Sequence, residues 1–451
     1  MRGGETKALT REASASSSTA PARYTQVAAV TLIGVCLVCG LYYVYRYPFR
    51  ISDPSTSPTY GSTPTWLQVG KYVLLAAIQL PVIAWGMWVV LTRRARLTRR
   101  ELLLAVLALY AAGRASAAGL AGGGHNALDV VAPVVSVVPI ALAVALGAGP
   151  DWPRRVGRIC LVAASALLLA HALANVAEIL MWHITGRLPA LAYRVGLKRF
   201  GGVWDDPNST AGFSAAFLVF LACRRVRMAA PLAAALVAAA ILNVAVAVAY
   251  SAVLGVAAGL AVLFIVRRPH VVRNLVILLV AAVLLVPAAP HVVDLLAHIP
   301  GLGLSSKRES FSERLHLRTY IASPGSPAGW IFGATRSHQF EDAYGDWLLA
   351  TGIVGLALLL GLIVWSVYSV RRSREFGWAA PTVVAVAVPS IFIPHLAIFP
   401  IAAIFLLSLS IPASFMERER ERATASRSIR QRARGRRPGD IWRARVRGAR
   451  R

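Results

Sequence analysis

Long apolar runs separated by short polar segments make up most of this chain. A helix that crosses a bilayer needs about 20 mainly apolar residues, and by that measure the pattern predicts about twelve spanning helices. They lie near residues 26–46, 71–92, 101–121, 127–148, 159–182, 209–223, 230–250, 251–266, 274–290, 344–370, 378–394 and 396–415. The sequence therefore predicts an all-α, polytopic integral membrane protein.

Composition and charge support this class and indicate an orientation. Hydrophobic residues make up 57% of the chain and charged residues only 15%, although 48 Lys and Arg face 20 Asp and Glu. Much of the positive charge falls in short clusters at 93–100, 223–227, 266–273 and 371–374, in the loops where cytoplasmic charge is expected. We therefore expect a multi-pass protein of the cytoplasmic (plasma) membrane with both termini cytoplasmic.

The same topology predicts four segments on the opposite, extracytoplasmic side: 47–70, 122–126, 183–208 and the large loop 291–343. In that loop Ser310 and Glu313 have the spacing of a capping box. Apolar residues follow them, so a short interfacial helix is expected near 310–321.

The two ends of the chain differ from the apolar domain, which we place at 26–415. Residues 1–25 are rich in Ser and Ala, and we expect a disordered cytoplasmic tail there. Residues 416–451 are rich in Arg and have too few apolar residues to fold alone. A basic tail beside a last span is more typical of binding to anionic membrane lipids than to nucleic acid, so no nucleic-acid partner is expected.

The four cysteines predict neither a disulfide framework nor a metal site. Cys36, Cys39, Cys160 and Cys223 all lie in or beside apolar segments, without the His or carboxylate neighbours of a zinc site. Neither a metal nor another cofactor is expected.

Polar residues inside the predicted spans are candidate functional groups, because such groups are costly at membrane depth. In the fifth span His171, Asn175, Glu178 and Trp182 share one helical face. This face either lines a polar cleft or forms an interhelical hydrogen-bond network. The same two interpretations apply to Arg114, His125, Asn126 and Asp129.

The segment 194–208 carries a stronger signal. Arg194, Lys198 and Arg199 place positive charge on the outer side, where topology does not require it, and this indicates an anionic ligand. Arginine suits a phosphate because its planar guanidinium donates two hydrogen bonds in a fixed geometry.

The residues that follow predict the start of a helix. Pro207 and Asn208 form a turn, with Asn208 or Ser209 as the N-cap, and a helix N-terminus itself favours an anion. The alternative is a capped turn alone, which leaves the three cations unexplained.

The motif Arg199-x-x-Gly202-x-Trp204-x-Asp206-Pro207-Asn208 resembles a signature of the O-antigen ligase and polymerase superfamily, membrane enzymes that move glycans carried on polyprenyl diphosphate. The order of later features is similar too. Ser251 begins a span, the large loop follows, and Glu341-Asp342-Ala343-Tyr344 precedes Gly352-Ile353-Val354-Gly355. The resemblance covers roughly residues 190–370.

The chain departs from the family pattern in two places. Ala252 stands where the family has a second phosphate-binding arginine, so the resemblance leaves that role to Arg314, Arg318 or Arg336 of the loop. Glu341 and Asp342 stand where the ligases have His and Asn, and His338 lies three residues before Glu341. Glu341 and His338 are therefore both candidates for the catalytic base.

The resemblance implies a membrane glycosyltransferase (GT-C-like) fold and metal-independent glycan transfer or polymerisation. Arg199, with Lys198 and Arg194, would hold the diphosphate. The implied partners are a polyprenyl-diphosphate-linked glycan, a glycan or lipid acceptor, and a chain-length regulator as a candidate. Two other hypotheses stay open: a transporter or flippase of a lipid-linked or anionic solute, and a non-catalytic scaffold that acts through the basic tail.

Overall fold

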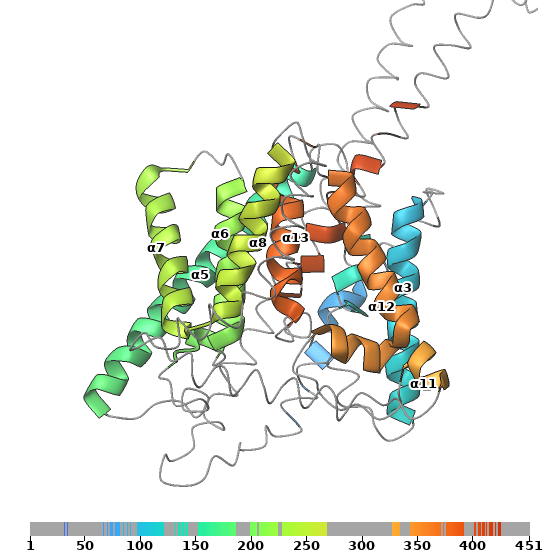
Figure 1. The fold of residues 1–451 in the computed structure, drawn as a ribbon, viewed down its shortest axis with the longest axis horizontal. Coiled ribbons are helices and arrows are strands. Elements are labelled where there is room, and N and C mark those ends of the chain that lie inside the picture. The colour runs from blue at the N-terminus through green and yellow to red at the C-terminus, as the bar shows by residue number, and fades with distance from the viewer. Residues whose placement is uncertain are drawn as a thin grey trace, which may run out of the picture.

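The computed structural model describes residues 97–120, 152–185, 199–204, 207–223, 228–267, 327–333, 343–370 and 376–391, with single positions elsewhere between residues 31 and 424. Every regular element in this part of the chain is a helix (Figure 1). The elements are α3 (Arg99–Leu120), α5 (Trp152–Thr185), η3 (Gly202–Trp204), α6 (Pro207–Cys223), α7 (Ala230–Ala247), α8 (Tyr250–Arg267), α11 (Pro327–Phe332), α12 (Ala343–Val370), α13 (Ala379–Ala387) and η4 (Pro389–Ile391). The predicted all-α class is confirmed for these residues.

Several helices have the length and composition of membrane spans. Leu161–Thr185, Ala230–Ala247 and Ala343–Val370 are long and apolar enough to cross a bilayer. Three shorter apolar helices accompany them, at Pro207–Cys223, Tyr250–Ile265 and Ala379–Ile391. Large apolar side chains such as Leu109, Ile184 and Val364 are exposed at 74%, 82% and 68%, as lipid-facing residues are. These features are those of a membrane protein.

The contacts between helices fix their relative directions. Phe220, late in α6, packs edge-on against Trp378, which immediately precedes α13. Arg100, early in α3, donates a hydrogen bond to Ser366, late in α12. The pairs α6–α13 and α3–α12 therefore run antiparallel, whereas α6, α8 and α12 all begin at one end of the bundle, where α7 and α13 finish (Figure 1). We call this end the Arg199 end, and the Arg clusters at 93–100, 223–227, 266–273 and 371–374 adjoin helix termini at the other end.

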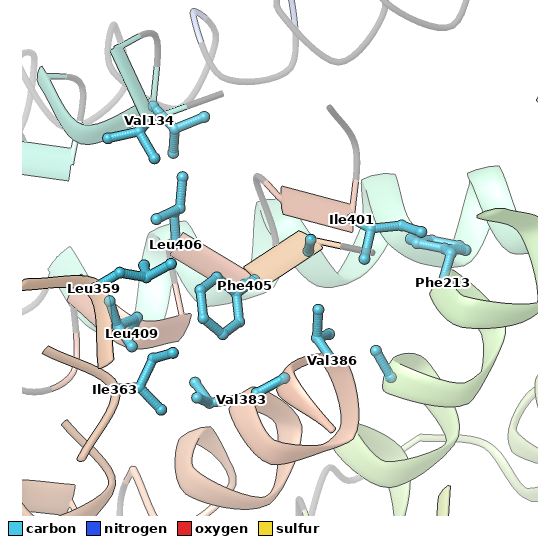
Figure 2. Packing of buried hydrophobic residues seen from close by; sticks show 14 of the residues in the cluster. Val134, Phe213, Leu359, Ile363, Val383, Val386, Ile401, Phe405, Leu406 and Leu409 are labelled. Carbon is cyan, nitrogen blue, oxygen red and sulfur yellow. The ribbon is translucent and has the colours of Figure 1, made fainter. Parts of the chain in front are cut away.

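The core joins segments that are far apart in the sequence. Phe405 and Leu406, both at most 1% exposed, pack among residues of α12 and α13 such as Leu359 and Val383 (Figure 2). Val134 and Phe213 belong to the same cluster. Burial of these large apolar side chains stabilises the bundle, while its outer surface remains apolar.

Helix α8 packs closely on its neighbours through two glycines spaced four residues apart. A β-carbon at Gly255 would lie 2.5 Å from the carbonyl oxygen of Ala385, and one at Gly259 would lie 2.8 Å from the side chain of Val219. Small residues at this spacing let helix backbones approach within a bilayer. The Gly-x-x-x-Gly pattern thus joins α8 to α6 and α13.

Three predicted spans differ at their ends from the helices of the structure. The span at 159–182 is part of a longer helix, α5, which begins at Trp152 and ends at Thr185. The span at 230–250 ends at Ala247, because Val248 adopts a left-handed conformation with φ of 46°. The span at 378–394 has its α-helix only to Ala387, and the following turn contains Pro389, which cannot continue a helical hydrogen-bond ladder.

Other predicted segments cannot be compared with the fold. The span at 274–290 and the helix near 310–321 lie outside the described residues, and those at 26–46, 71–92, 127–148 and 396–415 are described at single positions only.

Helix α12 is interrupted at Gly352, where φ is 68° and ψ is −175°. This conformation is essentially restricted to glycine. The short helix α11 lies against the break, and a β-carbon on Gly352 would collide with the backbone of Ile331. The interruption divides α12 into a short segment at the Arg199 end and a longer one that completes the span (Figure 1).

Candidate functional site

The segment Arg199–Gly202 lies between three helices at the Arg199 end of the bundle. The backbone N–H of Phe200 donates to the carbonyl oxygen of Val246 in α7, at 3.2 Å. Thr210 of α6 donates its hydroxyl to the carbonyl oxygen of Gly201, at 2.5 Å. The aromatic ring of Phe200 packs against Trp182 of α5. Backbone and side-chain contacts together hold this polar segment against α5, α6 and α7.

Arg199 is buried, with only 6% of its surface exposed, and its guanidinium is oriented by two neutral acceptors. Its Nε–H donates to the carbonyl oxygen of Ala247, at 2.7 Å, and Nη2 donates to Oδ1 of Asn208, at 2.5 Å. A backbone carbonyl and a side-chain amide accept from two different guanidinium nitrogens and so fix the orientation of the arginine. These two contacts place a cationic group beside the first turn of α6.

Helix α6 begins at Pro207, which corrects one expectation about its cap. Neither Asn208 nor Ser209 is the N-cap, since both already lie in the first turn of the helix. Proline is favoured as the first helical residue because its missing N–H needs no partner there and its φ is helical. The side chain of Asn208 instead receives the hydrogen bond from Arg199.

Gly202 allows the segment to lie directly against α5. Its φ is 59°, and a β-carbon there would lie 2.9 Å from Nδ1 of His171 and 3.3 Å from Oδ1 of Asn175. The glycine of the motif is thus required by packing and by backbone conformation.

The polar face of α5 forms an interhelical network, which was one of the two interpretations of this face. Asn175 donates to Oδ1 of Asn243 at 2.8 Å, and Asn243 in turn donates to Ser214 at 3.2 Å. Glu178 accepts the backbone N–H groups of Gly201 and Gly202, at 3.2 and 3.4 Å. The network connects α5 to α6, to α7 and to the 199–202 segment.

Three buried polar atoms of this region have no hydrogen-bond partner within the described part of the chain: Nε2 of His171, Oδ1 of Asn175 and Nε1 of Trp204. The rings of His171 and Trp204 meet edge to face, with centroids 4.2 Å apart. The contact between these rings fixes Trp204, the aromatic residue of the motif, against α5.

The described residues of the later motif, from Ala343 onward, also lie at the Arg199 end. Tyr344, in the first turn of α12, donates its hydroxyl to the carbonyl oxygen of Ala387, the last residue of α13, at 2.8 Å. Ser251 lies at the start of α8, as expected, and its hydroxyl is buried. The described ends of the two sequence motifs therefore lie at the same end of the bundle.

Arg114 and Tyr110 of α3 contact the interrupted region of α12. Tyr110 donates its hydroxyl to the carbonyl oxygen of Thr351 at 2.7 Å, and Arg114 donates to that of Gly333 at 2.7 Å. For Arg114 the network interpretation therefore holds. Sequence reasoning missed this assembly, and the available signal was Gly352 inside an otherwise apolar run.

Several predicted site residues lie outside the described residues, so their roles stay predictions. These are Glu341, His338, Asp342, Lys198, Arg194, Arg314, Arg318, Arg336, His125, Asn126 and Asp129. In the part of the chain that is described, no group of three or more His, Cys, Asp or Glu side chains is placed to hold a metal ion. No protein-family model matches this chain, and no curated protein matches it.

Proposed function

We propose that this protein transfers or polymerises glycan from a polyprenyl-diphosphate carrier on the outer face of the cytoplasmic membrane. The observation that carries the proposal is the buried guanidinium of Arg199, oriented by Asn208 and Ala247 beside the start of α6. A fixed guanidinium at a helix N-terminus favours a phosphate group both by charge and by hydrogen bonding. The resemblance of the surrounding motif to the O-antigen ligase and polymerase superfamily supplies the chemical class of the ligand.

The proposed step is an inverting glycosyl transfer. An acceptor hydroxyl oxygen attacks the anomeric carbon of the lipid-linked sugar, and the bond from that carbon to the diphosphate oxygen breaks. Arg199 stabilises the negative charge that develops on the leaving diphosphate, together with Lys198, Arg194 and a loop arginine. Glu341 or His338 accepts the proton of the attacking hydroxyl. No metal ion takes part in this scheme.

The start of α12 supports this arrangement. Tyr344 lies three residues after Glu341 and contacts the end of α13 at the Arg199 end. A base near residue 341 and a diphosphate group near Arg199 would then be reached from the same side of the membrane. The proposal extends to a GT-C-like architecture of about twelve spans with cytoplasmic termini, because the Arg-rich segments adjoin helix termini at the opposite end.

The test is the glycan phenotype of a deletion strain. We expect loss of a cell-surface glycan together with accumulation of a polyprenyl-diphosphate-linked precursor. Accumulation of a single repeat unit identifies a polymerase, and accumulation of a finished chain on lipid identifies a ligase. A strain with unchanged surface glycan and unchanged lipid-linked precursors would contradict the proposed function.

A transporter or flippase of a lipid-linked or anionic solute is the second candidate. The interruption of α12 at Gly352 favours it, since broken helices line the substrate sites of many transporters. Purified protein in liposomes separates the two: a transporter moves a labelled lipid-linked glycan across the bilayer, whereas the proposed enzyme joins it to an acceptor.

A further inference from the structure

Glu178 lies beneath the segment that carries Arg199 and binds its backbone. One oxygen, Oε2, accepts hydrogen bonds from the N–H groups of Gly201 and Gly202, at 3.2 and 3.4 Å. Two successive N–H groups in a turn form a concave site that favours an anion, and here the carboxylate of α5 is that anion. The sequence placed Glu178 on the polar face of α5 but gave no reason for a charge there.

Two adjacent glycines give the backbone after Arg199 more conformational freedom than any other residue pair. Without a restraint, that freedom would allow the arginine to leave the geometry that Asn208 and Ala247 define. A carboxylate that accepts both glycine N–H groups restricts this freedom, because one anionic oxygen then binds two successive backbone positions. The contact with Glu178 therefore restrains the two most flexible residues of the segment that carries Arg199.

We propose that Glu178 is a positioning residue for a diphosphate site at Arg199, which holds the Gly201–Gly202 backbone so that the guanidinium is preorganised for the anion. This inference rests on the proposed function, because it deepens the role given to Arg199. Glu178 acts through the backbone and does not contact the reacting atoms.

Because Glu178 is charged, the direction in which its removal changes diphosphate affinity tests the inference. By charge alone, a carboxylate near a diphosphate repels it, so its removal would tighten binding. Positioning has the opposite consequence, since loss of the restraint weakens binding. Glu178→Gln removes the charge but keeps an oxygen that accepts the glycine N–H groups, while Glu178→Ala removes both.

The experiment compares full-length wild type, Glu178→Ala and Glu178→Gln in detergent micelles, with farnesyl diphosphate as the probe. For each variant, the dissociation constant of the probe and the thermal unfolding temperature are measured. Glycan transfer from a polyprenyl-diphosphate carrier is assayed separately in membranes. Glu101→Ala and Glu101→Gln are the matched controls. Glu101 also accepts a backbone N–H, that of Thr98 at 2.9 Å, but at the start of α3 at the opposite end of the bundle.

We expect Glu178→Ala to weaken probe binding about tenfold and to raise the donor KM by a similar factor, as loss of charge-assisted hydrogen bonds implies. Glu178→Gln should change either value by no more than about threefold. The Glu101 variants should lower thermal stability with probe affinity unchanged.

Tighter probe binding by Glu178→Ala, or affinity equal to wild type, overturns the inference. The inference would also be overturned if the Glu101 variants lost as much probe affinity and thermal stability as Glu178→Ala does. The effect of Glu178→Ala would then be a general loss of structure. Wild type that binds the probe but transfers no glycan instead contradicts the proposed function alone. Absence of probe binding by wild type overturns both.

Discussion

Gly202 lies directly against the imidazole of His171, and a β-carbon at this position would be 2.9 Å from Nδ1. The same residue has φ of 59°, a backbone conformation that residues with a β-carbon rarely adopt. Conformation and packing therefore both require glycine at this position of the motif.

Gly202→Ala is expected to lower the free energy of unfolding by about 2 kcal/mol or more, since strain and overpacking add. The measurement is thermal or denaturant unfolding in detergent. Gly361→Ala is the control, because Gly361 lies in α12 with nothing within 4 Å of the added β-carbon. There alanine should be neutral or stabilising, by about 0.5–1 kcal/mol. Equal stability of the two variants would contradict the contact with His171.

Asn175 and Asn243 are expected to stabilise the bundle as a pair. Both are fully buried, and they share a 2.8 Å hydrogen bond between α5 and α7. Either single change to alanine leaves a buried amide without that partner and should cost about 1–3 kcal/mol. The double variant should cost less than the sum of the singles, with a coupling of about 1 kcal/mol in a double-mutant cycle. Additive losses would mean that the two amides act independently.

The helices could be predicted from the sequence because each is a long apolar run. The all-α class and the starts of α6, α8 and α12 follow from that pattern within two residues. The ends of α3, α6, α8 and α12 were predicted to within one residue, but the end of α7 was not. Val248 ends α7 in a left-handed conformation, and no glycine or proline there announces it.

The contacts of the site could not be predicted because they join residues far apart in the chain. The spacing of His171, Asn175 and Glu178 indicates one face, but it does not say that backbone N–H groups of residues 201 and 202 meet that face. Likewise, the interruption of α12 depends on α11 lying against Gly352. Helical propensity disfavours glycine only weakly, so the break is decided by tertiary packing.

Gly352→Ala should disrupt the region where α11 meets α12. The φ and ψ of Gly352 are not accessible to alanine, and its β-carbon would collide with the backbone of Ile331. We expect either a loss of about 2 kcal/mol or more in the free energy of unfolding or a straightened α12. Limited proteolysis of the 327–333 region reports whether α11 is displaced. Protection and stability equal to those of Gly361→Ala would show that α12 tolerates a side chain at the break.

Arg199→Ala is expected to reduce glycan transfer by about 10²-fold or more, since it removes a preorganised donor to the leaving group. Arg199→Lys keeps the charge but cannot donate to both Ala247 and Asn208 in the fixed geometry of a guanidinium, so an intermediate loss of roughly tenfold is expected. Transfer in membranes at matched protein levels is the measurement. Arg99→Ala is the control, because Arg99 is exposed at the opposite end of the bundle. Full transfer by Arg199→Ala would remove this residue from the proposed mechanism.

Glu341 and His338 are to be separated by their effects on kcat. A general base contributes about 10²–10⁴-fold to the rate, so loss of the true base should lower kcat by that factor. Binding of farnesyl diphosphate should be unchanged, because the base acts on the acceptor hydroxyl and not on the diphosphate. We expect one of Glu341→Gln and His338→Gln to show this loss and the other to retain most of the transfer rate. The pH profile identifies the group independently: the acidic limb, set by protonation of the base, should disappear only in the variant that lacks it. Full kcat in both variants would place the base elsewhere in the chain and would separate the diphosphate site at Arg199 from the segment that begins α12.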